Sequence, residues 1–546
     1  MSTAHPRRAP AAGIWLAVAV AFAAGVWVLY LLAAHTVVAN SDAATQILEG
    51  QSVTGGHVLL AGWTLSLDSF WATEVPFYAL AHLLVGVQPY LLPLVPAVIA
   101  ALVVAAGTLI AVEGRATPAA AAGAVTVVAL LLLPTYAMSQ FFLRGGDHIG
   151  AVLFALIAFY AIRRGRWGPG VVVAVVVLAA AMLGDLQAMA YGAGPMLVAG
   201  VATMLRWRSV RAGLPAACAA TGGGLLAFVA RRVVDTVGTF SIGAPNPIAS
   251  LHQVIANVGT AFNLGAQMVG TGNGLFGTGG VPRGLQDVRL VEAALLAWCL
   301  ALALLRLLCG VVSGRPRRRR GPIGPNRTAW WQSEPTGYLL DDMLVLAAVG
   351  SAASYVALAY ATQAAFGRYL VATIIFMVVL AGRVAARTWD RVQARRLKQG
   401  VALLAAGVTL CFAASAGYLI FGPRPANPAT SLATWLQAHD LTSGVGAYWD
   451  ATITTVESGD QVQVRPVIAD PGGRLVRYTR ESTADWYTGR PFQFLVFEPD
   501  AIWNGVDLDA AVRTFGRPAR TFHVGGYEIL VWSQPVEISP SGGYGA

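Results

Sequence analysis

This chain of 546 residues contains few charged side chains. Asp, Glu, Lys and Arg make up only 12% of it, whereas 56% of its residues are hydrophobic and its mean hydropathy is +0.61. Soluble globular domains carry about 25% charged residues. The composition therefore excludes an ordinary soluble protein and predicts a polytopic α-helical membrane protein.

Cysteine is equally scarce, with four residues in the whole chain. Cys218, Cys299, Cys309 and Cys411 all lie within apolar runs, and none forms a Cys-x-x-Cys pair. This spacing excludes a disulfide framework and a zinc-ribbon site. We interpret the four thiols as small packing residues.

Nucleotide-binding motifs are also missing. Gly444-Val445-Gly446 is the beginning of a glycine-rich loop, but the third glycine and the start of a phosphate-binding helix do not follow. A cytoplasmic nucleotide-linked substrate is therefore not expected.

The net charge of +10 is distributed unevenly. Residues 424–546 contain 9 Lys and Arg and 13 Asp and Glu, so this part carries 9 − 13 = −4 and the remainder carries +14. The positive charge lies in short loops, such as Arg163 to Arg166 and Arg315 to Arg320. Basic loops between apolar runs indicate cytoplasmic loops, so no nucleic-acid partner is expected.

Apolar runs of roughly 20 residues predict the membrane spans. Residues 383–398 contain six Lys and Arg, so this segment is expected on the cytoplasmic side and everything after residue 422 outside. Counting back from there gives about eleven spans with a cytoplasmic N-terminus. They are 13–34, 90–112, 118–136, 148–162, 168–184, 188–205, 214–230, 290–311, 343–362, 367–386 and 401–421.

The apolar stretch 70–87 does not fit this count as a span, because only one crossing can lie between residues 35 and 113. It contains Trp71, Glu74, Pro76 and His82. We interpret it as a juxtamembrane or re-entrant helix that lines a cavity. The outer loops are then 35–88, 138–148 and 231–287. The first run, 13–34, is too long for the apolar part of a signal peptide and is interpreted as a retained anchor.

The composition changes after residue 422, which divides the chain into a transmembrane domain, 1–422, and an extracytoplasmic α/β domain, 423–546. In the second part we predict helices at 431–439 and 507–515, strands at 444–449, 461–468 and 492–497, and a hairpin at 521–532. Asp450 and Glu457 are expected in solvent. The aromatic residues Tyr448, Trp449, Trp486 and Tyr487 are either core residues or platforms for sugar rings.

Asp42 is the most informative single residue. It follows the first span, where a carboxylate at the membrane edge is costly unless it has a partner or a function. It is either the N-cap of a helix that begins at Ala43 or a catalytic base. Other polar residues are expected on the same outer face, namely His57, Asp68, Glu74, Arg144, Asp147, His148, Asp185, Arg231, Arg232, Asp235 and Arg368.

These residue types fit one kind of chemistry. A sugar linked to a polyprenyl phosphate has a good leaving group once the phosphate charge is neutralised, and the acceptor hydroxyl needs a base. Arg144 and Arg368 suit the phosphate, because guanidinium groups bind phosphate in a bidentate manner. Helix caps, snorkelling of Arg side chains to lipid headgroups, and an ion pair between Asp185 and an Arg are the structural alternatives.

The layout of residues 13–421 resembles the GT-C glycosyltransferases, in particular the group of protein O-mannosyltransferases and aminoarabinose transferases. The similar parts are Asp42, the segment from Trp71 to Tyr78, Asp147 and Gly367-Arg368-Tyr369-Leu370. The chain departs from the family pattern in having no second acidic residue beside Asp42, and Glu74-Val75-Pro76 in place of a Lys-Pro-Pro-like element.

The resemblance implies a membrane glycosyltransferase that moves a sugar from a polyprenyl-phosphate carrier to a glycan, lipid or protein acceptor. It implies that Asp42 is the catalytic base and that Asp147 assists it. We expect Glu74, Arg144, His148, Asp185 and Arg368 to bind substrate. No cofactor is assigned; a divalent cation stays open, with no metal ligands named. The alternatives are a lipid or solute transporter and a non-enzymatic envelope scaffold.

Overall fold

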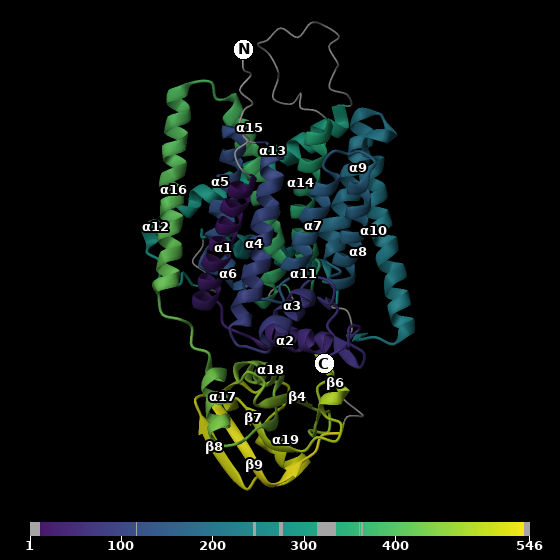
Figure 1. Ribbon diagram of the computed structural model, residues 1–546, viewed down its shortest axis with the longest axis vertical. Coiled ribbons are helices and arrows are strands. Elements are labelled where there is room, and N and C mark those ends of the chain that lie inside the picture. Colours follow the sequence, from purple (N-terminus) through teal and green to yellow (C-terminus); the bar gives the residue numbers. More distant parts are fainter. Residues whose placement is uncertain are drawn as a thin grey trace, which may run out of the picture.

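The computed structural model describes residues 11–115, 117–243, 247–271, 277–313, 335–359, 361 and 364–539. A long helical bundle stands above a smaller domain that contains a β-sheet (Figure 1). This agrees with the predicted class, a helical membrane protein with a C-terminal α/β domain.

The bundle is built from the apolar runs of the sequence. Its helices are α1 (Ala11–Thr36), α4 (Leu91–Val112), α5 (Pro118–Leu132), α7 (Ile149–Ile162), α8 (Pro169–Gly184), α9 (Gly194–Trp207), α10 (Val210–Val237), α13 (Arg289–Ser313), α14 (Pro335–Val356), α15 (Val371–Arg391) and α16 (Arg395–Phe421). A π-helical turn, Met189–Ala193, leads into α9, and a 3-10 turn, Ala364–Leu370, leads into α15.

Within the described residues, seven helices are long and apolar enough to cross a membrane, or eight if one bent pair counts as a single span. The chain is therefore a multi-pass membrane protein. Each of the eleven predicted spans contains a helix, but α7 and α8 have only 14 and 16 residues. The total of eleven spans stays a prediction.

The predicted span 118–136 is wrong at its end. Helix α5 stops at Leu132, and the chain turns by 85° into the short helix α6 (Tyr136–Phe142). Pro134 lacks an amide N–H and cannot continue the helix. Thr135 then starts α6 as its N-cap, since its hydroxyl accepts from the Met138 N–H at 3.0 Å.

Two helices, α2 (Ser41–Thr54) and α3 (Val75–Val85), lie beneath the bundle, and α2 runs crosswise to its helices (Figure 1). Helix α3 is the segment predicted not to cross, and its short length agrees with that prediction. The two helices approach closely, because a Cβ atom on Gly50 would lie 2.8 Å from the Tyr78 and Ala79 backbone. Only glycine permits this approach.

The side chain of Asn40 caps α2, accepting from the Ala43 N–H at 2.9 Å. The alternative that Asp42 is the cap is therefore wrong. Asp42 lies in the first turn of the helix, two residues after the cap, and its carboxylate takes part in other contacts.

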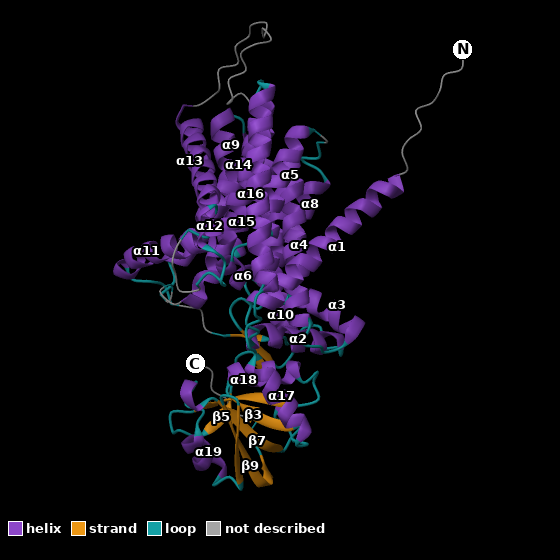
Figure 2. Ribbon diagram, turned by 90° about the vertical axis from the view of Figure 1, so that its left-hand side faces the viewer, coloured by secondary structure: helices purple, strands orange, loops and turns teal. Residues whose placement is uncertain are grey.

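The loop after α10 leads to α11 (Leu251–Met268), which projects sideways from the bundle (Figure 2). Leu251, Ile255 and Phe262 are exposed on it. Exposed apolar side chains on such a helix suit the lipid interface. A short helix, α12 (Arg283–Asp287), then leads into α13.

The C-terminal domain has a six-stranded sheet in the order β5-β4-β3-β7-β9-β8. Its strands are β3 (Ser443–Gly446), β4 (Gln463–Ala469), β5 (Leu475–Arg477), β7 (Phe492–Phe497), β8 (Arg520–Val524) and β9 (Tyr527–Val536). Strand β3 is parallel to β4 and β7, and the remaining pairs are antiparallel. Its helices are α17 (Pro428–Ala438), α18 (Tyr448–Glu457) and α19 (Leu508–Phe515), with 3-10 turns at Ala484–Trp486 and Pro499–Ala501.

The predicted strand 444–449 is too long. Strand β3 ends at Gly446, and Tyr448 begins helix α18. Aromatic and β-branched residues, which favour strands, fill this helix, so its sequence gives no helical signal. Asp450, expected in solvent, is buried in it, because α18 packs on strand β4 on one side and on α2 on the other.

The C-terminal domain is attached to the bundle by backbone pairing as well as by the linker. Strand β1 (Trp63–Leu65) of the first loop pairs in parallel with β2 (Ser241–Ile242) and antiparallel with β6 (Ser482–Thr483) of the C-terminal domain. Three segments that are far apart in the sequence therefore form one small sheet at the junction of the two parts.

Candidate functional site

A polar cavity of about 190 Å³ lies between the end of the bundle and the C-terminal domain. This is far more than the roughly 10–15 Å³ that one water needs. The bundle side of the cavity includes Asp42, Gln46, Asp68, His148, Arg368 and Tyr369. The C-terminal domain contributes Tyr448, Trp449, Tyr478, Arg480, Glu481 and Trp503.

Asp42 and Arg368 face each other in this cavity. Arg368 Nη1 lies 3.5 Å from Asp42 Oδ2. The other carboxylate oxygen, Oδ1, accepts from the Tyr448 hydroxyl at 2.7 Å. Three separate elements, α2, the turn before α15 and α18, thus meet at one carboxylate.

Asp147 approaches the same nitrogen of the guanidinium, with Oδ1 3.9 Å from Arg368 Nη1. Its side chain is buried, and neither oxygen has a hydrogen-bond partner within the described residues. Burial raises the pKa of Asp147, and the nearby Arg144 and Arg368 lower it in part. The N-cap position of α7 belongs to His148, so Asp147 does not cap this helix.

A glycine turn places Asp147 behind Asp42. Gly145 and Gly146 have φ values of 81° and 70°, which favour glycine. A Cβ atom on Gly145 would lie 2.7 Å from the Tyr78 hydroxyl oxygen. The chain can therefore pass close to α2 and α3 only with glycine at this position.

His148 and Asp185 form a buried pair. His148 Nδ1 lies 2.9 Å from Asp185 Oδ2, which also accepts from the Tyr191 hydroxyl at 2.7 Å. The alternative that Asp185 pairs with an Arg is wrong, because its partners among the described residues are His148, Tyr191 and the Gln187 amide.

Asp68 is a lining residue to which the sequence assigned no role. Burial, and then the nearby Asp185, raise its pKa to about 7. One ligand atom from each of Asp68, His148 and Asp185 lies within 4.8 Å of the other two, so the group could hold a metal ion. Hydrogen bonds already occupy Asp185, which accepts from Tyr191 and from the Gln187 amide, so a cation would compete with them.

Glu74 is buried outside the cavity. Its Oε1 accepts from the Gly150 N–H at 2.8 Å at the beginning of α7, and the Thr73 hydroxyl contacts its other oxygen. Burial raises the pKa of Glu74 to about 7. Among the described residues, its contacts connect the start of α3 to α7.

Arg144 does not line the Asp42 cavity. It lies in a second cavity of about 440 Å³, with walls that include Ala33 of α1, Val37 and Val38 just after this helix, and Leu92 of α4. Arg144 Nε is buried and has no hydrogen-bond partner within the described ranges. The two predicted phosphate-binding arginines therefore face different cavities, and Arg424 and Glu457 line the second one together with Arg144.

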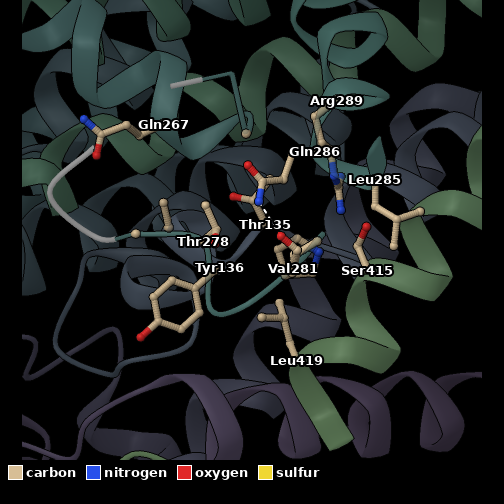
Figure 3. A pocket seen from close by; sticks show the side chains of 14 residues that line it. Thr135, Tyr136, Gln267, Thr278, Val281, Leu285, Gln286, Arg289, Ser415 and Leu419 are labelled. Carbon is tan, nitrogen blue, oxygen red and sulfur yellow. Dashed lines mark hydrogen bonds between the residues drawn. The ribbon is translucent and has the colours of Figure 1, made fainter. Parts of the chain in front are cut away.

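A third, smaller cavity of about 40 Å³ lies between α6, α12 and α16 (Figure 3). Arg289 at its edge is paired with Glu292 at 2.8 Å and donates to the Leu133 carbonyl at 2.7 Å. This cation is already neutralised, so we do not assign a ligand here.

The remaining polar residues of the outer loops do not join the Asp42 cavity. His57 is exposed on the first loop. Arg231 pairs with Asp235 at 2.8 Å along α10, and Arg232 lies over the ring of Phe228. Neither arginine lines the cavity.

Sequence reasoning missed the contribution of the C-terminal domain. Tyr478, Arg480, Glu481 and Trp503 line the cavity without forming a motif in the sequence. The aromatic residues Tyr448 and Trp449 were a signal, but core packing was the favoured interpretation of them.

The fold and the bundle-end cavity define the class, which is a multi-pass membrane protein with the GT-C fold. Its structure is similar to the crystal structure of ArnT from Cupriavidus metallidurans in the apo state, with a TM-score of 0.51 and 12% identity, covering 95% of this chain and 98% of that one. ArnT from the same organism bound to undecaprenyl phosphate aligns with a TM-score of 0.50 and 14% identity, covering 94% and 98%.

At this level of identity the similarity shows the fold and not the activity. It confirms the fold that the sequence resemblance implied, including the sheet-containing C-terminal domain. No protein family model and no curated protein match the sequence.

Proposed function

We propose that this protein transfers a sugar from a polyprenyl-phosphate carrier to an acceptor hydroxyl on the extracytoplasmic side of the membrane. The observation that carries the proposal is the approach of two carboxylates, Asp42 and Asp147, to Nη1 of Arg368 beside a polar cavity. Buried charges at the edge of a membrane are expensive and mark substrate sites by default.

Asp42 is the proposed base. As the acceptor oxygen attacks the anomeric carbon, its proton passes to the Asp42 carboxylate. A bond forms between the acceptor oxygen and the anomeric carbon, and the bond from that carbon to the phosphate oxygen breaks. The electron pair of the broken bond leaves with the polyprenyl phosphate. Asp42 takes the proton of the acceptor hydroxyl.

Arg368 is the proposed phosphate ligand. Its distances to the two carboxylates, 3.5 and 3.9 Å, exceed the roughly 2.7–2.9 Å of a tight charge-assisted hydrogen bond. The guanidinium therefore keeps donors for an entering phosphate, whose developing charge it would stabilise. Asp147, whose Oδ1 lies near Nη1 of Arg368, would hold this guanidinium in position.

The second cavity supports a lipid-linked substrate. Its aliphatic walls on α1 and α4 suit an isoprenoid chain, and Arg144 suits an anionic headgroup. Ala43 lines this cavity and Asp42 lines the polar one, so the first turn of α2 separates the two. ArnT, which shares the fold, binds undecaprenyl phosphate.

The orientation is part of the same proposal. The basic segment 383–398 lies at the end of the bundle opposite to Asp42 (Figure 1). With that segment cytoplasmic, the cavity and residues 423–546 are extracytoplasmic, and residues 1–422 are the catalytic domain. A reporter fused after Gln88 is expected to signal from the outside.

Transfer in proteoliposomes tests the function. Purified protein is incubated with radiolabelled polyprenyl-phosphate sugars and a membrane extract as the source of acceptors. We expect label to move covalently into an acceptor with the wild type and not with Asp42→Asn. Label that crosses the vesicle membrane on unmodified carrier lipid would instead indicate a transporter.

A further inference from the structure

The C-terminal domain presents a cluster of four aromatic side chains to the Asp42 cavity. Tyr448, Tyr478 and Trp503 contact one another, with ring centroids 5.2 Å apart for the tyrosine pair and 5.1 and 5.9 Å apart for the pairs with Trp503. Trp449 lies against Tyr448 at 5.0 Å. These distances are within the usual range for aromatic pairs.

This cluster is only partly a core. Tyr448 and Tyr478 are buried, whereas Trp449 is 42% exposed and Trp503 is half-buried, and all four rings line the cavity that contains Asp42. Tyr487, another candidate platform of the sequence, is buried and does not line this cavity, and its hydroxyl donates to the Pro466 carbonyl. Trp486 packs edge-on against Trp63 at 4.9 Å, at the junction with the first loop.

The position of the cluster is fixed relative to Asp42. The Tyr448 hydroxyl donates to Asp42, and Thr452, one helical turn later on α18, donates to the Ser41 carbonyl at 3.1 Å. The Ser66 N–H donates to Glu481 Oε1 at 2.7 Å, next to the pairing of β1 with β6. The rings are therefore held over the carboxylate from two sides.

The chemistry of such a surface matches a sugar. The C–H faces of a sugar ring are apolar and pack on the negative faces of aromatic rings. The hydroxyl groups at its edge need a few placed polar partners, which is the usual composition of a small-molecule site. Arg480 and Glu481, next to Tyr478 in the chain, line the same cavity.

We infer that Tyr448, Trp449, Tyr478 and Trp503 form a binding subsite for a sugar ring, contributed by the C-terminal domain and placed against Asp42 by the Tyr448 hydroxyl. The identity of the reaction at Asp42 rests on the proposed function, whereas the subsite rests on the cluster itself. The ring belongs either to the carrier-linked sugar or to a sugar of the acceptor.

Binding to full-length protein in nanodiscs tests the subsite. The probes are undecaprenyl phosphate and the same lipid carrying mannose, glucose or arabinose. We expect the Trp503→Ala and Trp449→Ala variants to bind the preferred sugar-bearing lipid about tenfold more weakly, because one aromatic contact contributes this much to the binding free energy. Their affinity for undecaprenyl phosphate should be unchanged. Trp532→Ala is the matched control, because Trp532 packs edge-to-face against Phe515 in the same domain and does not line the cavity.

The two sources of the sugar give different results. If the carrier sugar occupies the subsite, the variants weaken sugar-lipid binding. If an acceptor sugar occupies it, lipid binding is unchanged, and kcat/KM for the acceptor falls about tenfold. Wild-type values in both measurements, or an equal loss for lipid with and without sugar, would overturn the inference.

If the proposed function is wrong, the wild-type protein will bind no polyprenyl phosphate and transfer no sugar. This result differs from the results that would overturn the subsite. Saturation-transfer NMR with methyl glycosides then tests the subsite alone. Signals that Trp503→Ala abolishes and Trp532→Ala retains would support it, and the absence of signals would overturn it.

Tyr448→Phe tests the placement of Asp42, because it keeps the ring and removes the hydroxyl. We expect kcat to fall about tenfold, which is the usual worth of a hydrogen bond to a charged group, with the KM of the carrier unchanged. A variant with wild-type kcat would contradict this role for the Tyr448 hydroxyl.

Discussion

The two ends of the helical bundle use the same residue types in opposite ways. At the end away from the C-terminal domain, Arg383 Nε lies 2.6 Å from Asp341 Oδ1, and Arg206 Nη1 lies 2.8 Å from Asp342 Oδ2. At the Asp42 end, Arg368 is 3.5 and 3.9 Å from its two carboxylates.

The difference separates a structural ion network from a binding site. Direct ion pairs neutralise the acidic residues of the first end, as burial in a membrane protein requires. At the second end, both oxygens of Asp147 and the Nε2 atom of His148 are buried without a hydrogen-bond partner among the described residues, next to a cavity. Unpaired polar atoms also occur at the first end, where Nε and Nη2 of the buried Arg206 have no hydrogen-bond partner among the described residues. What marks the site is that its unpaired atoms, including both carboxylate oxygens of Asp147, lie next to a cavity.

The largest expected effect is loss of transfer in Asp42→Asn. Removing the base should lower kcat by about 10²–10⁴-fold, and the midpoint of thermal unfolding should stay near that of the wild type. Radiolabel transfer and differential scanning fluorimetry measure the two quantities. A variant that retained most of its activity would exclude Asp42 as the base.

At the opposite end we expect loss of stability. Arg206→Met leaves Asp342 buried without its cation and should lower the free energy of unfolding by about 3–5 kcal/mol. The double variant Arg206→Met with Asp342→Leu should recover most of this loss. Unfolding in mixed micelles measures both variants. If the single variant were fully stable, the two ends would not differ as described.

Arg368→Lys should have an intermediate effect. Lysine keeps the charge but loses the planar fork that binds phosphate with two hydrogen bonds, so the KM of the carrier lipid should rise about tenfold. Arg232→Lys, also predicted in an outer loop but away from the cavity, is the matched control and should behave as the wild type. An unchanged KM for the carrier lipid in Arg368→Lys would show that this side chain does not bind the phosphate.

The smallest effect concerns a buried carboxylate of the C-terminal domain. Burial, and then Glu498, raise the pKa of Asp450 to about 8, whereas the unfolded chain ionises near pH 4. The folded domain therefore binds the extra proton, and its stability should fall as the pH rises from about 4 to about 8. Asp450→Asn should reduce this fall.

Urea titrations at pH 6 and pH 8, followed by near-ultraviolet circular dichroism, measure the pH effect. A wild type with the same midpoint at both pH values would show that Asp450 is ionised in the folded domain.

Several features of the fold were accessible from the sequence because they depend on local composition. Apolar runs located the bundle helices, whereas the parity count that makes 70–87 a segment that does not cross stays a prediction. The bend at Pro134 was missed because the apolar run continues through it. Helix α18 was missed because its residues favour strands, and packing between α2 and the sheet overrides that preference.

The site was accessible only in part, since its contacts join distant residues. The approach of Asp42 to Arg368 followed from membrane topology, because both were expected on one face. The hydrogen bond from Tyr448 crosses 406 positions of sequence and leaves no local signal. The cap at Asn40 and the pairing of Asp185 with His148 depend on backbone geometry that composition does not describe.

A cryo-electron microscopy structure of Asp42→Asn with undecaprenyl-phosphate-linked sugar would show how the proposed site holds its substrate. We expect phosphate within hydrogen-bond distance of Arg368, the anomeric carbon facing position 42 and the isoprenoid chain leaving past α1. Phosphate bound only at Arg144, with the sugar outside the Asp42 cavity, would contradict this expectation.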